Sequence, residues 1–339
     1  MKLFRRNEFY VACTIMALGC LIQGVSGQFF TTNNITDLAR SIIVPGMLGL
    51  GTMMILISGN IDISFPALSM LSMFAVIKWF MAIQYQGPVV LGFILCAVLG
   101  AALGAINGIL AAWLKLPTLI ITLGTGSIFL GLMQGVLKSS VISILPPPIA
   151  SLSKTFLYTV YNSKLDISSS LPAVFLFLPV AVIIMFIIMH YTMLGRGIYA
   201  LGGDPISCER AGFNVVKIRI FVFTFMGMIS GMVGMTRVVL TGMVQPNTLI
   251  GYELTSIAAV VLGGVSLSGG KGTITGSLLG VTLLTMITNS LILLGIPSYW
   301  SKCFTGIFIV AGIGITSFRT LQAKRRVNTV ALEEYGKQS

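Results

Sequence analysis

Acidic side chains are scarce in this chain, and Asp62 is the first candidate among them for chemistry. The 339 residues contain only nine aspartates and glutamates. Asp62 lies in a polar cluster with Ser58, Asn60 and Ser64, and this cluster separates two long apolar runs. A carboxylate in such surroundings is costly unless it faces protein or a water-filled path. Two interpretations stay open: the charge serves a function, or Asp62 caps the following helix at the cytosolic surface.

Other residue types that do chemistry lack the spacing that chemistry needs. The five cysteines show no metal-ligand pattern, and the single histidine, His190, is expected to pack at the end of a helix. Residues 269–272 (GGKG) look like part of a phosphate-binding loop, but Gly272 stands where serine or threonine must follow the lysine, and position 265 carries valine rather than glycine. We therefore expect no enzyme activity and no metal or cofactor bound by this chain.

Residues 192–214 (TMLGRGIYALGGDPISCERAGFN) form a polar, glycine-rich segment between two apolar runs. Asp204 can cap a helix, Pro205 suits the first helical position, and Gly212 suits a left-handed stop. This pattern predicts a short helix over residues 205–211. A helix of that length is not stable alone, so it needs another surface, and a partner protein is the natural candidate. The alternative is a loop helix that lies at the membrane interface.

Composition sets the class of protein. Hydrophobic residues make up 55% of the chain, charged residues only 9%, and the mean hydropathy is +0.97. Soluble domains carry about 25% charged residues, so this is an integral membrane protein. We predict an all-α polytopic fold, a single domain over residues 1–339, with a cytosolic segment at 193–217 and an outer loop at 139–170. The predicted spans are 10–28, 41–59, 64–83, 88–113, 117–137, 171–192, 219–240, 253–268, 273–295 and 302–318.

The basic residues predict the orientation of these spans. With both termini in the cytosol, most of the 21 lysines and arginines fall on the cytosolic side, as the positive-inside rule requires. The net charge of +12 then reflects topology and contact with anionic lipid rather than nucleic acid. The first apolar run resembles a cleavable signal peptide, but its length favours an uncleaved first span.

Small and hydroxyl residues recur at helical spacing in several spans. Gly100, Gly104 and Gly108 lie four apart, as do Gly276 and Gly280, which predicts close helix crossings. The hydroxyls of Thr118, Thr122 and Thr125 either line a polar route or bond back to helical carbonyls. Near the predicted outer end, Asn289, Ser290, Tyr299 and Trp300 suit an interfacial belt or a sugar-like ligand.

Several blocks together resemble a known family, the membrane-spanning permease subunits of bacterial ABC importers for monosaccharides of the ribose, xylose and galactose type. The resemblance covers most of the chain. The matching blocks are residues 59–64 (GNIDIS), Asn107 with Gly108, residues 117–125 (PTLIITLGT), Gly195 with Arg196, residues 200–204 (ALGGD), residues 251–254 (GYEL) and residues 257–272, which end in SLSGGKG. The chain departs from the family pattern at Asn60, Phe65, Pro66 and Asp204, and the changes near Asp62 bear on the choice of solute.

The resemblance implies partners and site residues. It implies a dimer with a second or homologous permease, separate ATPase subunits that use ATP, an external solute-binding protein and a place in the bacterial inner membrane. The residues expected to couple to the ATPase are Gly202, Gly203, Asp204, Pro205, Ile206, Glu209, Arg210 and Gly212. The residues expected to line the solute path are Asn60, Asp62, Ser64, Asn107, Thr122, Thr125 and Asn289.

Three other functions remain as alternatives. The same architecture could carry a nucleoside, a polyol, a quorum-signalling sugar derivative or a branched-chain amino acid. A self-sufficient secondary transporter would need ionisable residues inside the spans, for which only Asp62 and Glu253 are available. An intramembrane enzyme is the weakest alternative, because the sequence shows no nucleophile or metal constellation.

Overall fold

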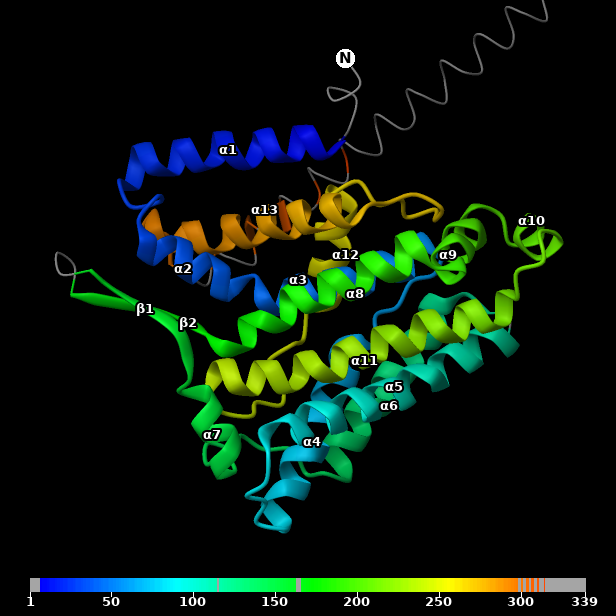
Figure 1. Cartoon of the computed structure of the whole chain (residues 1–339), viewed down its shortest axis with the longest axis horizontal. Helices are drawn as coiled ribbons and strands as arrows, with labels where there is room; N and C mark the ends of the chain where they lie inside the picture. Colours follow the sequence, from blue (N-terminus) through cyan, green and yellow to red (C-terminus); the bar gives the residue numbers. More distant parts are fainter. Residues whose placement is uncertain are drawn as a thin grey trace, which may run out of the picture.

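Helices make up almost all of the described chain in this computed structural model, which describes residues 7–114, 116–162 and 166–297 and single positions between 300 and 314 (Figure 1). The helices are α1 (Asn7–Ser26), α2 (Thr32–Ser41), α3 (Ile43–Ile57), α4 (Phe65–Ala82), α5 (Val89–Trp113), α6 (Thr118–Gly135), α7 (Pro147–Ser153), the 3-10 turn η2 (Ala173–Leu176), α8 (Phe177–Tyr191), α9 (Met193–Gly203), α10 (Pro205–Arg210), α11 (Val215–Thr241), α12 (Tyr252–Leu262) and α13 (Ile274–Leu293).

The long helices confirm the polytopic all-α class. Among the described residues, seven helical segments are long and apolar enough to cross a membrane, and α2 with α3 makes an eighth if that pair, bent by 43°, counts as one span. α10 lies at one end of the molecule and the strands lie at the opposite end, which matches the predicted cytosolic and outer sides (Figure 1). The predicted span 302–318 lies largely outside the described residues.

The predicted span 253–268 is wrong as a continuous helix. α12 ends at Leu262, and the turn that follows has left-handed backbone at Gly264, Gly269 and Gly270. Eleven helical residues reach only about 16 Å, half the thickness of the hydrocarbon layer. In this turn Val265 and Gly269 are buried, while Leu267, Ser268 and Lys271 are exposed.

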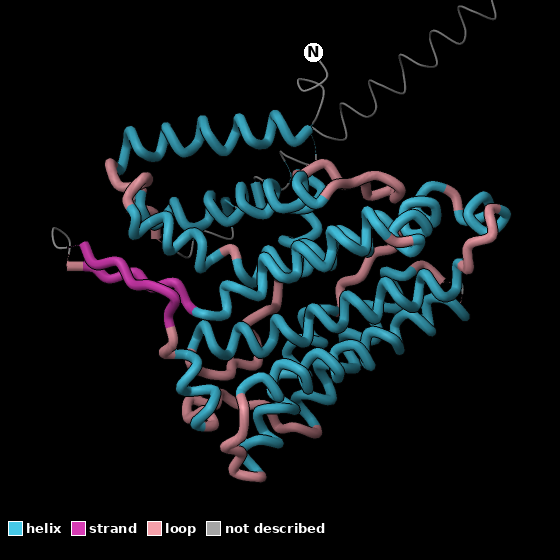
Figure 2. The backbone as a smooth tube through the Cα atoms, viewed as in Figure 1, coloured by secondary structure: helices cyan, strands magenta, loops and turns pink. Residues whose placement is uncertain are grey.

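The outer loop contains two strands that an all-helical class does not predict. β1 (Phe156–Asn162) pairs antiparallel with β2 (Ile167–Pro172), and both project from the helices (Figure 2). β1 has the sequence FLYTVYN, whose aromatic and β-branched residues favour strands. Asn33, next to the start of α2, donates hydrogen bonds to Val160 O and Ser169 Oγ, each at 3.3 Å, so the hairpin is tied to the first half of the chain.

Glycines hold α5 and α11 together, as their spacing predicts. A methyl group at Gly100 would overlap the carbonyl oxygen of Gly227, and one at Gly104 would overlap that of Phe223. Gly108 packs in the same way on Ile220. The predicted crossing at Gly276 and Gly280 is also present, against Ala259 of α12 and Gly263, the residue that follows α12. The absence of side chains lets these helix backbones touch.

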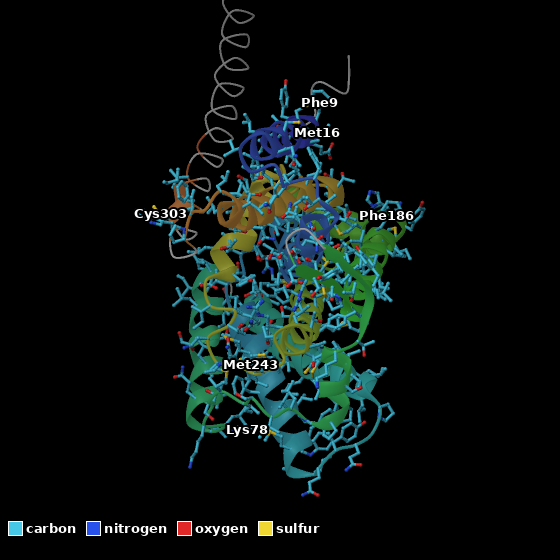
Figure 3. The ribbon with its side chains drawn as sticks, turned by 90° about the vertical axis from the view of Figure 1, so that its left-hand side faces the viewer. Phe9, Met16, Lys78, Phe186, Met243 and Cys303 are labelled. Carbon is cyan, nitrogen blue, oxygen red and sulfur yellow. The ribbon has the colours of Figure 1, made fainter. Side chains whose placement is uncertain are left out.

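Apolar side chains face outward on several helices, as expected where lipid replaces water. Met16 of α1 is 71% exposed and Phe186 of α8 is 44% exposed, and both project from the margin of the molecule (Figure 3). The first helix packs on α13, and Val11 of α1 belongs to the same small buried cluster as Val281 and Leu284 of α13. α1 is thus an integral part of the helix assembly in this chain.

Candidate functional site

The short helix α10 begins with the cap that the sequence predicts. Asp204 accepts hydrogen bonds from the backbone nitrogens of Ile206 at 3.4 Å and Ser207 at 3.0 Å, and from Ser207 Oγ at 2.5 Å. These bonds, led by the one from the Ser207 hydroxyl, lower the pKa of the Asp204 carboxyl below its usual range. Pro205 occupies the first turn, where a missing N–H costs nothing. The cap is therefore charged at neutral pH.

The other end of α10 is closed by a left-handed glycine. Gly212 has φ of +86°, and its nitrogen donates to Glu209 O at 2.9 Å. The nitrogen of Phe213 donates to Cys208 O at 3.2 Å. Together these two bonds make a Schellman motif, which satisfies carbonyls that a helix end otherwise leaves without partners. α10 is thus defined at both ends by its own sequence.

Most of α10 is left uncovered by the described chain. Pro205, Ile206, Ser207, Glu209 and Arg210 are exposed, and the Ile206 side chain is 61% exposed. Only Cys208 is buried, with its Sγ 3.8 Å from the carbonyl oxygen of Gly197 in α9. An isoleucine and two charged residues thus form an exposed surface at the end of the molecule opposite the hairpin.

A helix that the sequence analysis missed, α9, connects α10 to the core. The hydroxyl of Thr192 accepts from the nitrogen of Gly195 at 3.1 Å and so caps the start of α9. The sequence did contain a signal for the start of α9, because Thr192 is a residue type that caps helices and apolar residues follow it. Gly195 packs on the end of α8 and Gly197 on Phe213, so both glycines allow close contacts.

The end of α9 meets two other parts of the chain at backbone contact. Gly202 is buried, and a methyl group there would overlap Ile57 O at the end of α3 and lie 2.6 Å from Gly270 N. Gly270 N also donates to Ile57 O at 2.9 Å. We call this contact between Ile57–Gly59, Gly202–Gly203 and Gly269–Gly270 the glycine junction. Gly202 therefore lies inside the protein, while Gly203 and every residue of α10 except Cys208 are exposed.

The predicted polar cluster between α3 and α4 is a real interruption of helix. Residues 60–64 have no regular structure, and Asn60, Asp62 and Ser64 are all buried. Asp62 Oδ1 accepts from Ser64 N and Ser64 Oγ, each at 2.7 Å, which holds the turn into α4. Asp62 is 5% exposed, so it does not lie at a water-exposed surface as the capping interpretation supposed. The role of its charge in transport stays a prediction.

Three other predicted path residues surround this interruption. Asn107 of α5 donates through Nδ2 to Ser64 Oγ at 2.7 Å, and Thr122 of α6 accepts from Ile63 N at 3.3 Å. Thr118 accepts from Ile61 N at 3.0 Å, while the Thr125 hydroxyl bonds back to Thr122 O. Two threonine hydroxyls of α6 thus accept hydrogen bonds from backbone nitrogens of the irregular segment, and Asn107 of α5 holds the Ser64 side chain. These bonds help to stabilise an irregular segment here.

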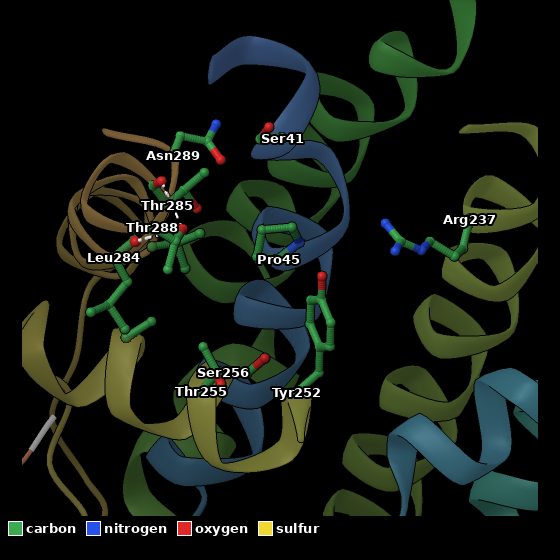
Figure 4. A pocket seen from close by; sticks show the side chains of 12 residues that line it. Ser41, Pro45, Arg237, Tyr252, Thr255, Ser256, Leu284, Thr285, Thr288 and Asn289 are labelled. Carbon is green, nitrogen blue, oxygen red and sulfur yellow. Dashed lines mark hydrogen bonds between the residues drawn. The ribbon is translucent and has the colours of Figure 1, made fainter. Parts of the chain in front are cut away.

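Asn289 lies apart from this cluster. It lines a cavity of about 310 Å³ whose walls come from α2, α3, α11, α12 and α13. Arg237 of α11 faces the same cavity and was not predicted as a path residue (Figure 4). The sequence could have indicated Arg237, because a charged side chain within an apolar span is energetically costly unless it faces protein or water. The predicted path residues therefore divide into an enclosed network and one residue at an open cavity.

Comparison with known proteins decides the family. Residues 34–312 match the family model described as the permease component of the branched-chain amino acid transport system. The chain belongs to this permease family. The matched range includes α9, α10, the polar interruption and the cavity. The permease is a multi-pass protein of the inner membrane and a subunit of an ABC import system.

Relatives of the permease are named for the import of ribose and of autoinducer 2. The ribose import permease protein of Escherichia coli strain K12 is 32% identical over 314 residues, which cover 88% of this chain and 90% of the relative. The autoinducer 2 import system permease protein of Yersinia enterocolitica is 31% identical over 296 residues, which cover 87% of this chain and 78% of the relative. The corresponding protein of Photorhabdus luminescens is 31% identical over 312 residues, covering 92% and 90%. No solved structure matches the permease.

Proposed function

We propose that this chain forms the membrane path of an importer for a monosaccharide or a sugar-derived signal, and that a separate ATPase docks on α10 to drive it. The exposed, doubly capped α10 is the observation that carries the proposal. A helix this short keeps its shape through its two caps, so it presents Ile206, Glu209 and Arg210 in a fixed arrangement before any partner binds. Preorganisation of this kind reduces the cost of association.

The relatives support a sugar as the solute class. Their names specify ribose and autoinducer 2, while the description of the family model specifies branched-chain amino acids. Full-length relatives at about 31% identity are nearer to this chain than a broad family description, so a monosaccharide or sugar-derived solute is the proposed cargo. An external binding protein would deliver it on the side of the hairpin, and a second copy of the chain or a homologous permease would complete the path.

The glycine junction gives this function a mechanical route. α9 ends in backbone contact with the end of α3 and with the turn between α12 and α13. A close-packed contact without side chains cannot absorb movement by changing rotamers, so a displacement of α9 and α10 moves the segments beside it. Closure of the ATPases would then rock these helices between inward-open and outward-open arrangements. ATP is used by the partner, and this chain needs no cofactor of its own.

Reversal of one charge on α10 tests the docking surface. Arg210→Glu changes an exposed side chain, so the fold should lose no more than about 0.5 kcal/mol. At an interface the same reversal leaves charges mispaired, which costs several times more. We expect normal amounts of the variant in the membrane, loss of solute uptake and poor co-purification with the ATPase.

Arg210→Lys is the matched control, because it keeps the charge and should keep most uptake. Ile206→Asp should act like Arg210→Glu, because it places a charge on the exposed apolar side chain of the surface. Normal uptake and co-purification for Arg210→Glu, Ile206→Asp and Gly212→Pro together would remove α10 from the mechanism.

A further inference from the structure

The cavity near Asn289 has the size and position of a solute site. Its volume of about 310 Å³ is at the lower end of small-molecule pockets, which matches a solute of monosaccharide size. Arg237 lies one turn before the end of α11, and Asn289 lies one turn before the end of α13. Both helices run from the α10 end of the molecule toward the hairpin, so the cavity lies toward the outer side (Figure 1).

Arg237 is held in place but not neutralised. Its Nε donates to Thr248 Oγ1 at 2.9 Å, and the guanidinium extends toward Tyr252 across the cavity (Figure 4). Among the described residues, none forms an ion pair with it, and no aspartate or glutamate lines the cavity. A membrane-embedded arginine of this kind requires hydrogen-bond acceptors from water or a solute. The terminal nitrogens of Arg237 are the main donors of the site.

Ser256 supplies a second, independent sign that the cavity takes a polar ligand. Its side chain is 2% exposed and lines the cavity, and its hydroxyl has no hydrogen-bond partner among the described residues. A buried hydroxyl without a partner has lost its hydrogen bonds to water, and a ligand hydroxyl would replace them. Ser256 is therefore available both to donate and to accept.

Two threonine hydroxyls and one amide on the cavity walls favour a solute with hydroxyl groups, beside the further hydroxyls of Ser41, Tyr252 and Thr285. Thr255 donates its proton to Gly251 O at 3.0 Å, and Thr288 donates to Thr285 O at 2.9 Å, so both present only acceptor lone pairs to the cavity. Asn289 offers a donor and an acceptor on the opposite wall. A sugar hydroxyl can meet both kinds of group. An anion has no proton to give to Thr255 or Thr288, and an ammonium group finds no carboxylate here.

We propose that this cavity binds a neutral polyhydroxylated solute of monosaccharide size. Two adjacent hydroxyls of the solute bind the Arg237 guanidinium, a third binds Asn289 and a fourth binds Ser256. The ring of Tyr252 provides an apolar face for the C–H side of the sugar. This assignment deepens the proposed function and rests on it for the direction of transport. It places solute selection in the outer half of the molecule, away from the buried network around Asp62.

Binding to the purified full chain in lipid nanodiscs tests the assignment without any partner subunit. The probes are D-ribose, D-xylose, D-galactose and erythritol, with L-leucine and D-ribose 5-phosphate as the competing classes, and the measurement is the midpoint of thermal unfolding. A ligand that binds only the folded state raises the midpoint by an amount that grows with the logarithm of the ligand concentration once that concentration exceeds Kd. We expect at least one neutral probe to raise the midpoint with this concentration dependence. Arg237→Gln and Asn289→Ala should each need about tenfold more of that probe.

Arg40→Gln is the matched control. Arg40 is an exposed arginine near the same end of the molecule, and it donates to Leu240 O at 3.0 Å without lining the cavity. This variant should keep the response of the parent chain. If Arg237→Gln does not fold, Arg237→Lys retains the charge but loses the planar pair of donors, and Asn289→Ala reports from the other wall.

Three outcomes would overturn the assignment. The first is that the parent chain, Arg237→Gln and Asn289→Ala respond equally to every neutral probe, and a lack of any response in all three counts as this outcome. The others are tighter binding of L-leucine, or tighter binding of D-ribose 5-phosphate that depends on Arg237. The docking proposal is judged separately, because Arg210→Glu should keep the sugar response while it loses uptake. If Arg210→Glu instead keeps uptake, docking at α10 is wrong and the cavity result still stands.

Discussion

At the residue scale, the polar side chains of this permease fall into two groups with different surroundings. Asn107 donates to Ser64 and Ser64 donates to Asp62, so these three buried side chains form one chain of hydrogen bonds, in which only Asn107 Oδ1 has no partner among the described residues. Arg237 and Ser256 instead retain hydrogen-bonding capacity beside a cavity. Hydrogen bonds between enclosed side chains stabilise one backbone arrangement, whereas unpaired groups that line a cavity are available to a ligand.

Asp62 provides a test that separates shape from charge. In Asp62→Asn an oxygen can still accept from Ser64, so the turn into α4 should persist and unfolding should change little. If the charge contributes to transport, uptake by this variant falls at both limiting and saturating solute. Asp62→Ala removes the acceptor, and the variant should lose about 1–3 kcal/mol of stability because Ser64 is left unpaired.

Uptake and thermal unfolding of both Asp62 variants are the measurements. Normal uptake by Asp62→Asn, together with the expected loss of stability in Asp62→Ala, would show that Asp62 acts only by holding the turn.

At the element scale, helix contacts depend on where side chains are missing. The long helices α5 and α11 cross with backbone in contact at Gly100, Gly104 and Gly108. The exposed side of α6 also carries glycines, and a methyl group at Gly124 would meet nothing within 4 Å. Glycine is thus required for close packing on α5 but not at Gly124 of α6.

This difference predicts opposite effects of added side chains. Gly104→Val places a branched side chain against Phe223 O, so we expect a loss of about 1–3 kcal/mol or failure to assemble. Gly124→Ala should be neutral or stabilise by about 0.5–1 kcal/mol, because alanine restricts the unfolded helix segment more than glycine does. Thermal unfolding in nanodiscs and the yield of folded protein measure both. Equal stability of the two variants would contradict the close crossing.

At the scale of the whole molecule, the proposed docking helix and the β-hairpin lie at opposite ends of the helices. α10 is at one end, the hairpin is at the other, and the glycine junction joins α9 to the segments that lead into the core (Figure 1). Movement of a docked ATPase must therefore pass through rigid helices to reach the cavity. The buried contacts at Gly202 make the junction suited to transmit such movement.

The predicted orientation can be tested from exposed positions at these two ends. In a background without native cysteines, Gln86→Cys in the loop between α4 and α5 should react with an impermeant thiol reagent in intact cells. Glu209→Cys on α10 should react only after the membrane is opened, because the basic residues predict a cytosolic α10. Labelling of Glu209→Cys in intact cells would reverse the topology and remove the ATPase from α10. The terminal positions 3 and 335 give the same test but lie outside the described residues.

The sequence alone determined the features that depend on neighbours along the chain. Hydropathy over about 20 residues indicated most of the spans, and the order Asp204, Pro205, Gly212 predicted a short helix with both of its ends. The spacing of Gly100, Gly104 and Gly108 predicted a close crossing. These rules hold because a helix satisfies its backbone hydrogen bonds locally, so its caps, its length and its small-residue face are local properties.

Only the tertiary structure decided which distant groups meet. Asn107 and Ser64 are 43 positions apart in the sequence but share a hydrogen bond. Gly202 contacts Ile57 and Gly270, and no spacing in the sequence predicts that contact. The sequence likewise left open whether a polar residue in a span bonds back, joins a network or faces a cavity, and so it grouped Asn289 with Asp62 and omitted Arg237. Those outcomes depend on how helices pack against one another, because packing determines which side chains are enclosed and which retain unused hydrogen bonds.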